Sequence, residues 1–200
     1  MIATNGIQAG PFYIPPFTAY PGQIVLIHFP DLPDFLSATR QLANILINTT
    51  SPLTHEPGDV LRRVDTPMDM ECDWRNRFYP TSVQRYIRRN GNPENDPAQR
   101  AVSLTGVTPR TAVNQIPYAY RKLIALCTTL SWTNKIIFDL AGLGPAGGIA
   151  AFQLVKESIG TSGIAIFTDN HDEFKDQCSQ YIPVTFKDKT ENASQTIMRG

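Results

Sequence analysis

The chain has 200 residues, with 18 basic and 18 acidic side chains, so its formal net charge is zero. This length suits one domain with a sizeable core, and a neutral chain has no global field that draws it to nucleic acid or acidic lipid. Its apolar stretches fall far short of the ~20 residues that a membrane helix needs, so we expect no membrane partner.

The composition favours strands, turns and long loops over helices. Charged residues make up only 18% of the chain, and there are 16 prolines. The polar residues are mostly Thr, Asn, Ser and Gln. Because Thr, Asn and Ser compete for helical backbone hydrogen bonds and Pro removes a donor, this composition predicts a β-rich fold.

Residues 1–22 are predicted to be an extended arm, followed by a single globular domain over residues 23–200. Within residues 1–22, four prolines block helix formation, and aromatic residues lie between them. These rings must pack either on their own domain or on a neighbouring subunit. We take subunit contact as the sharper hypothesis for four of them: Phe12, Tyr13, Phe17 and Tyr20.

A strand and then a helix are predicted next. Residues 23–29 form a continuous apolar run between Gly22 and Pro30, typical of a strand buried on both faces. Over residues 35–47 the apolar side chains recur at helical spacing, and Asp34 is in position to cap the start of that helix.

The segment 59–100 contains eight of the twelve arginines, with acidic residues between them. Thr81 or Ser82 is predicted to cap a short helix here. Its basic side chains, Arg85, Arg88 and Arg89, allow two readings. They form a solvated face paired with the nearby acids, or they make weak contact with RNA phosphates.

The remaining elements lie between residues 118 and 186. The stretch 118–132 fits a helix by its spacing and a strand by its Thr-rich end. Strands are predicted at 135–140 and 163–168, with an apolar segment at 149–159 between them. A further strand at 181–186 carries Pro183, which places it at a sheet edge.

The strongest local motif is Gly-Leu-Gly-Pro-Ala-Gly at residues 142–147, which lies between a predicted strand and a helix. This GxGxxG pattern is typical of dinucleotide-binding turns, and its letters resemble the glycine turns that bind flavin, nicotinamide or S-adenosylmethionine. In that role Gly142 permits the turn, Gly144 lets a pyrophosphate approach, and Gly147 lets the helix pack closely. Asp169, at the end of the next predicted strand, would bind the ribose.

Other features oppose cofactor binding at this turn. Asp169 follows Gly142 by 27 positions (169 − 142), which exceeds the ~20 typical of the fingerprint. Only residues 170–200 follow it, too few to complete a doubly wound sheet. A glycine-rich turn that only connects two strands would have the same sequence, so the motif does not require a bound cofactor. We therefore assign no cofactor-binding residues, and a nucleotide- or cofactor-binding α/β domain that uses this turn is the alternative hypothesis.

The sequence predicts no catalytic and no metal-binding residues. Asp169, His171 and Asp172 are ligand types, but adjacent residues seldom all point inward, and no HxxxH or HxH spacing occurs. No GxSxG elbow is present. Cys127 lies in an apolar run, where thiolate formation is disfavoured. The three cysteines are too far apart for a redox or zinc motif, and we expect free thiols in a reducing compartment.

The later part of the chain resembles picornavirus-like coat proteins. The similarity lies in a short helical segment at residues 82–89, an apolar stretch with aromatic residues at 116–132, and an ending at 181–186. The resemblance implies a β-sandwich of jelly-roll type packed into a shell. Residues 1–60 depart from that pattern.

These observations together predict a β-rich α+β domain, sandwich-like or jelly-roll-like, with a few helices and the N-terminal arm. The expected function is that of a non-enzymatic structural subunit, a capsid protein that assembles with itself or with sister chains. The expected location is a virion or the cytoplasm of an infected cell, because residues 1–10 lack the features of a signal peptide.

Overall fold

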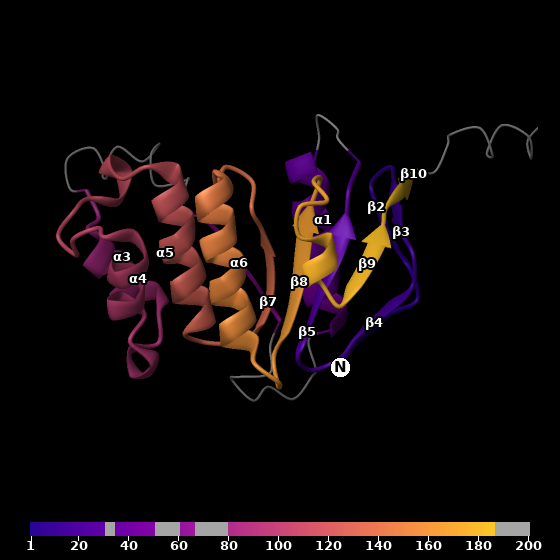
Figure 1. Cartoon of the computed structure of the whole chain (residues 1–200), viewed down its shortest axis with the longest axis horizontal. Helices are drawn as coiled ribbons and strands as arrows, with labels where there is room; N and C mark the ends of the chain where they lie inside the picture. The colour runs from indigo at the N-terminus through magenta and orange to yellow at the C-terminus, as the bar shows by residue number, and fades with distance from the viewer. Residues whose placement is uncertain (31–34, 51–60, 67–79, 187–200) are drawn as a thin grey trace, which may run out of the picture.

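A five-stranded parallel sheet forms the centre of the molecule (Figure 1). The structure is a computed structural model that describes residues 1–30, 35–50, 61–66 and 80–186. The sheet order is β6-β7-β8-β5-β9, and every neighbouring pair is parallel. Its strands are β5 (Gln23–His28), β6 (Arg62–Arg63), β7 (Lys135–Asp139), β8 (Ile164–Asp169) and β9 (Gln180–Pro183).

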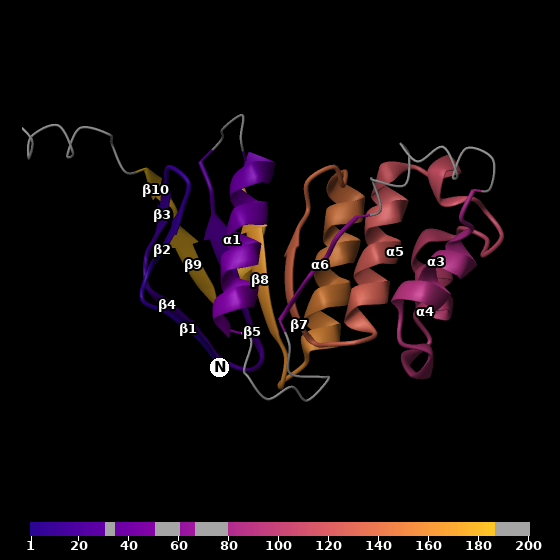
Figure 2. The same ribbon diagram turned by 180° about the vertical axis from the view of Figure 1, so that it is seen from behind.

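Helices cover both faces of this sheet. The helices α5 (Tyr118–Leu130) and α6 (Pro145–Ile159) pack on one face, and α1 (Phe35–Thr50) packs on the other, as the two opposite views show (Figures 1 and 2). Alternate residues of β5 enter opposite cores: Leu26 packs with the α5 and α6 side chains, and Ile27 with those of α1. The inner strands are therefore apolar on both faces, which explains their continuous apolar runs.

Residues 1–19 fold onto the chain itself as short antiparallel strands. β1 (Ile2–Thr4) pairs with β4 (Phe17–Ala19), while β2 (Ile7–Ala9) and β10 (Thr185–Phe186) flank β3 (Phe12–Ile14). Phe12 and Phe17 are buried in the core beside α1, and the Phe12 ring meets the edge of Phe29 at 5.5 Å between centroids. The predicted arm is thus a paired part of the fold.

The segment between β6 and β7 adds a small helical layer beside α5. It contains α3 (Val83–Asn90) and α4 (Pro97–Thr105), together with the 3-10 turns η2 (Pro93–Asn95) and η3 (Val113–Gln115). Ser82 caps α3, as predicted, by accepting a hydrogen bond from the Arg85 amide at 3.2 Å. A further turn, η4 (Lys175–Gln177), joins β8 to β9.

The prediction of a β-rich sandwich is wrong, because the sheet is parallel and lies between helices. The helix α5 shows why composition misleads, because its Thr-rich end has an intrinsic preference for an extended chain. Thr128 and Thr129 donate their hydroxyls to the carbonyls four residues earlier, at 2.7 and 3.0 Å, and so stay within the helix. Burial of nearly the whole helix outweighs their weak intrinsic preference.

The predictions of individual strands and helices are more accurate than the prediction of the fold class. The strands at 23–29, 135–140 and 163–168 and the helix at 35–47 are all confirmed. Asp34, the predicted cap of that helix, lies outside the described residues. β9 pairs only with β5, so Pro183 is at the sheet edge, as expected. In the described part of the chain, no helix has the length and apolar character needed to cross a membrane.

Candidate functional site: a cavity at the carboxyl edge of the sheet

A cavity of about 390 Å³ opens at the carboxyl ends of β6, β7 and β8. Ligand pockets commonly measure about 300–1,000 Å³, so this one is large enough for a small molecule. In open parallel sheets, ligands bind outside this same edge, where successive connections leave for opposite faces. Here β5 leads into α1 on one face and β7 leads into α6 on the other.

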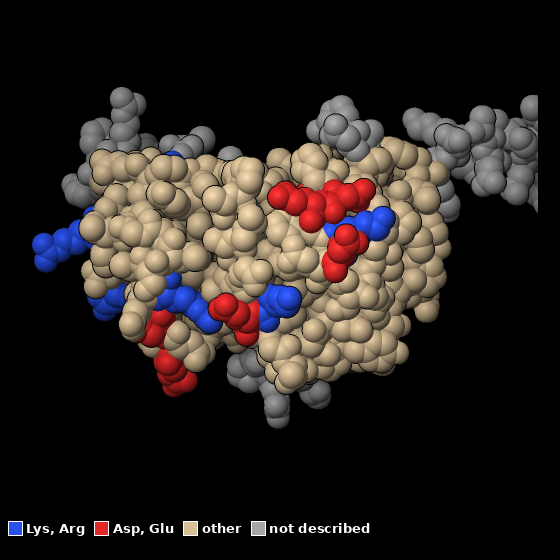
Figure 3. All heavy atoms as spheres, viewed as in Figure 1, with Lys and Arg blue, Asp and Glu red and all other residues tan. Residues whose placement is uncertain are grey.

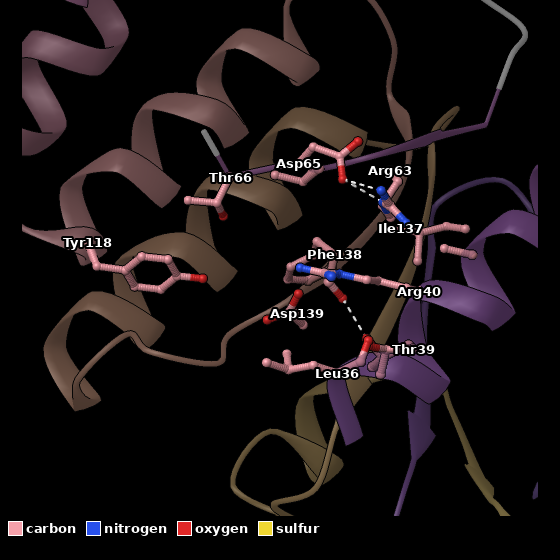
Figure 4. Close-up of a pocket in the computed structure, with 13 residues that line it drawn as sticks. Leu36, Thr39, Arg40, Arg63, Asp65, Thr66, Tyr118, Ile137, Phe138 and Asp139 are labelled. Carbon is pink, nitrogen blue, oxygen red and sulfur yellow. Dashed lines mark hydrogen bonds and ion pairs between the residues drawn. The ribbon is translucent and has the colours of Figure 1, made fainter. Parts of the chain in front are cut away.

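Polar side chains reach the cavity from several elements. Arg40 and Thr39 come from α1, Asp139 ends β7, and Tyr118 begins α5 (Figure 4). The other lining residues follow β6 or lie on the sheet and on α1: Arg63, Val64, Asp65, Thr66, Ile137, Phe138, Thr168, Leu36 and Ala43. The first turns of α1 therefore face the strand ends, because Phe35 and Ala38 anchor that helix in the core.

Arg40 is the charged residue of this site whose guanidinium is unpaired among the described residues. It is exposed, and its side chain extends from α1 into the cavity, toward the Tyr118 hydroxyl on the opposite wall (Figure 4). Its side chain forms no ion pair and no hydrogen bond with any described residue. A guanidinium offers five N–H donors in a planar fork that matches a phosphate or carboxylate. Arg40 is therefore available to hold an anion.

Arg63 and Asp65 neutralise each other on the upper wall of the cavity. Both Nε and Nη2 of Arg63 lie 2.6 Å from the same oxygen of Asp65, Oδ1. The Asp65 side chain is largely exposed, so this pair adds little to stability. It does fix the Arg63 side chain beside the cavity and leaves no net charge there.

Asp139 and Lys122 form a second ion pair, deeper in the wall. The Lys122 ammonium donates to Oδ1 of Asp139 and, at 2.8 Å, to the carbonyl of Ala141. The Ala141 amide also donates to Oδ1, at 2.9 Å. Lys122 is only 4% exposed. The pair joins α5 to the end of β7 and holds the Asp139 carboxylate in place.

The glycine turn of residues 142–147 joins β7 to α6, which confirms the strand–turn–helix setting of the motif. Gly142 has φ of 77°, and a Cβ there would lie 2.4 Å from Cε1 of Tyr118. Gly144 is the N-cap residue just before α6 and has nothing within 4 Å of an added Cβ. None of the three motif glycines lines the cavity. Gly142 instead lets the Tyr118 ring pack over the turn.

Asp169 does not face the cavity either. It is 7% exposed, and its Oδ1 accepts the amide N–H groups of Asn170 at 2.8 Å and His171 at 3.3 Å. Burial raises the pKa of this carboxyl, against the lowering effect of those two hydrogen bonds. Its role is to shape the turn after β8, where the sequence had suggested a ribose contact.

A histidine–carboxylate contact lies at the neighbouring strand ends. Nδ1 of His28, at the end of β5, lies 3.4 Å from Oδ1 of Asp172, too poorly aligned for a hydrogen bond. The His28 ring stacks on Tyr181 of β9, with 5.4 Å between centroids.

Within the described ranges, no group of three His, Cys, Asp or Glu side chains is arranged to hold a metal ion. Exposed acidic side chains gather over this end of β8 (Figure 3).

The cysteines offer no nucleophile in the described part of the chain. Burial raises the pKa of the Cys127 thiol to about 12 and that of Cys178 to about 11, so both stay protonated at neutral pH. Both are free thiols. Cys72 and His55 lie outside the described residues.

Sequence reasoning missed the residues that line the cavity. Arg40 lies on the polar face of a helix that was predicted correctly, and Asp139 is near the end of a strand that was also predicted. A polar residue at the carboxyl end of a predicted parallel strand is the signal that would have pointed to this edge. Arg63 and Tyr118 had no such signal, because their positions depend on long-range packing.

The comparisons with known proteins agree with the observed architecture. No family model matches the sequence, and no curated protein matches it significantly. Solved structures do match. One is described as an ABC transporter ATP-binding protein from Pyrococcus furiosus, with a TM-score of 0.59, 14% identity, and coverage of 84% of this chain and 87% of that chain.

Two further structures have the same arrangement. An ATP-binding subunit of an ABC transporter gives a TM-score of 0.57 at 12% identity, covering 92% of this chain and 86% of that one. An RNase-L inhibitor gives 0.55 at 11% identity, covering 92% of this chain and 42% of that one. At these identities the likeness establishes the α/β fold alone.

The expected relationship to picornavirus-like coat proteins is therefore wrong, and with it the assignment as a capsid or virion protein. Two of the solved structures that match are described as ATP-binding parts of ABC transporters, and the central sheet of this chain is parallel. The short helix predicted at 82–89 is α3, and the stretch at 118–132, for which both a helix and a strand were considered, is the helix α5.

Of the four aromatic residues proposed for subunit contact, Phe12 and Phe17 are buried within the chain itself. Tyr13 is half-buried, and Tyr20 is 52% exposed. Contact of this segment, which contains the accessible Tyr13 and Tyr20, with a second copy or a sister chain stays a prediction.

Proposed function

We propose that this chain is a binding domain for a nucleotide-type anionic ligand, held in the cavity at the carboxyl edge of the sheet. The observation that supports this most directly is the Arg40 guanidinium, which projects without an ion-pair partner among the described residues into a ligand-sized cavity. The parallel fold, which is similar to that of ATP-binding proteins, adds independent support.

The ligand is not held in the manner of a P-loop. That loop needs the pattern GxxxxGK[ST], whose backbone amides and lysine surround the phosphates. The pattern occurs nowhere in this sequence. Between β5 and α1 the residues run Phe-Pro-Asp-Leu-Pro-Asp, with two carboxylates, no glycine and no lysine. These residues do not fit a triphosphate cradle, so we propose binding without hydrolysis.

The residues that line the cavity match the chemical groups of a small nucleotide, which are its phosphate, base and ribose. Arg40 would pair with a phosphate through charge-assisted hydrogen bonds. The Tyr118 ring offers an aromatic surface for a base, and base–aromatic stacking contributes about 1–3 kcal/mol. Thr66 and Asp65 provide polar groups of the kind that bind ribose hydroxyls. The apolar share of the wall comes from Leu36, Ile137 and other sheet residues.

Isothermal titration with AMP, ADP and ATP tests the proposal. We expect saturable binding of at least one of them and no release of inorganic phosphate from ATP. Replacement Arg40→Ala should weaken that binding tenfold or more, because a hydrogen bond to a charged group contributes about 1.5–3 kcal/mol. Arg110→Ala, on an exposed residue that lines no described cavity, is the matched control.

Unchanged binding in Arg40→Ala, or the absence of binding by every nucleotide tested, would exclude this function for the cavity. Circular dichroism of each variant establishes that it is folded. Because Arg40 is exposed, we expect its replacement to leave the fold intact.

A second candidate function is weak binding of a polyanion such as RNA at α3. Arg85, Arg88 and Arg89 surround a hollow of about 500 Å³, together with Ser82 and Gln84. The sequence favoured pairing with nearby acids, but these arginines form no ion pair among the described residues. Every side chain of the hollow is a hydrogen-bond donor, which suits phosphate oxygens.

Fluorescence anisotropy with single-stranded RNA tests this candidate. Affinity should fall steeply as salt rises, and replacing the three arginines by alanine should abolish it. The Arg40→Ala variant, whose substitution lies on α1, should retain it. Binding that is insensitive to salt, or that survives the triple replacement, would rule out α3 as the site.

A further inference from the structure

Asp139 lies where a divalent cation would be expected to accompany a bound nucleotide. It ends β7 and borders the cavity at the carboxyl edge of the sheet. Magnesium in nucleotide sites is usually held by one or two carboxylates together with the phosphates of the ligand. Asp139 and Asp65 are the carboxylates among the described lining residues. Both would have to be free for a metal to use them.

One oxygen of each carboxylate is already held by a cation of the chain. Oδ1 of Asp139 accepts hydrogen bonds from the Lys122 ammonium and from the Ala141 amide. Asp65 holds both Nε and Nη2 of Arg63 at 2.6 Å. Each negative charge on the cavity wall is thus already paired with a positive charge from the chain.

Lys122 is not able to move aside easily. Its side chain is 5% exposed, and its ammonium also donates to the Ala141 carbonyl at 2.8 Å. The residue belongs to α5, whose side chains are buried along nearly the whole helix. Removing the ammonium from this position would take one donor from the Ala141 carbonyl and leave the Asp139 carboxylate with the Ala141 amide but without its counter-charge. An incoming metal would therefore have to bind Asp139 directly beside a fixed, buried positive charge that repels it.

We infer that the ligand of this cavity binds without a divalent metal, and that Lys122 is the residue that makes the site independent of metal. This inference rests on the proposed function. The ammonium of Lys122 binds Oδ1 of Asp139 and neutralises the carboxylate as a built-in counter-ion. Arg40 then provides the only unpaired positive charge among the described lining residues. One such charge suits a nucleoside monophosphate better than a magnesium-bound triphosphate.

Titration calorimetry with AMP, with either excess Mg²⁺ or EDTA present, gives the first test. In wild-type protein we expect the same affinity in both conditions, and we expect AMP to bind more tightly than ATP. Affinity that rises severalfold with Mg²⁺ would overturn the inference while leaving the proposed nucleotide binding intact. Absence of binding in both conditions would instead count against the proposed function.

A second test uses Mn²⁺ alone and needs no nucleotide. Electron paramagnetic resonance should show no Mn²⁺ bound at this site in wild-type protein. Lys122→Met frees the Asp139 carboxylate, so Mn²⁺ binding should appear. It should disappear again in Lys122→Met/Asp139→Asn, which removes the carboxylate. Mn²⁺ binding to wild-type protein that is lost in Asp139→Asn would overturn the inference.

A third test uses only wild-type protein, so it shows whether a metal binds in the cavity even if Lys122→Met fails to fold. Mn²⁺ broadens the nuclear resonances of groups close to it, and Tyr118 lies on the cavity wall. We expect the Tyr118 ring signals to stay sharp when Mn²⁺ is added, both with and without AMP. Selective broadening of these signals would place a metal in the cavity and contradict the inference.

Discussion

Gly142 shows how one residue shapes the wall of the cavity. Its φ of 77° is in the left-handed region, and its missing side chain leaves room for the Tyr118 ring. Gly144, two residues later, has φ of −67° and open space around it. The two glycines therefore have different structural requirements, although they occupy equivalent-looking positions in the motif.

We predict that Gly142→Ala lowers the free energy of unfolding by roughly 1–3 kcal/mol, because it combines backbone strain with a clash against Tyr118. Gly144→Ala is the control and should change it by less than about 0.5 kcal/mol. Urea unfolding of both variants measures the difference. Equal stability losses in the two variants would contradict this account of the turn.

Asp169 should make stability depend on pH. Burial raises its pKa above the usual value of 3.8, so the folded state holds the proton more tightly than the unfolded state. Its stabilising contribution is present below 3.8 and is lost as pH rises through the raised value. Asp169→Asn keeps an acceptor for the two amide groups and cannot ionise.

Asp169→Asn should therefore be more stable than wild-type protein near neutral pH, and this advantage should shrink as the medium is acidified. Unfolding curves measured across that pH range give the comparison directly, because titrations shared by both proteins cancel. A variant that is less stable than wild type by a constant amount at every pH would show that the turn needs the carboxylate itself.

At the scale of elements, α6 is held to the sheet by a cluster of aromatic rings. Phe152 is fully buried, stacks on Phe174 at 4.6 Å and meets Phe167 of β8 at 5.9 Å between centroids. Ile149, on the same helix, is 51% exposed. The apolar face of α6 thus fixes the helix that follows the glycine turn.

Phe152→Ala should lower the free energy of unfolding by about 3–5 kcal/mol, the range for a large buried ring removed from a packed core. Ile149→Ala, on the exposed face, should change it by less than about 0.5 kcal/mol. Chemical denaturation compares the two. A small effect of Phe152→Ala would mean that α6 does not depend on this cluster.

Local sequence patterns predicted the elements whose signal is local. The run at residues 23–29 and the strand ending at Asp139 are apolar on both faces, and α1 has clear helical spacing. β6 has only two residues, so no pattern could predict it. α5 was ambiguous because burial on nearly all sides hides helical periodicity.

At the scale of the whole molecule, strand order determined which prediction survived. A parallel β7-α6-β8 unit supports the alternative of an α/β binding domain and excludes the jelly roll. Composition could not reveal this order, because pairing between β5 and β8 joins residues far apart in the sequence. The same non-local pairing brings Arg40, Arg63 and Tyr118 together, so the sequence motif pointed to the glycine turn and missed the cavity.

A crystal structure of the protein with bound AMP tests the central claim most directly. We predict electron density for the ligand in the cavity, with its phosphate on Arg40, its base near Tyr118, and the Lys122–Asp139 pair intact without a metal. Density over the turn of residues 142–147, or a metal ion on Asp139, would contradict the account.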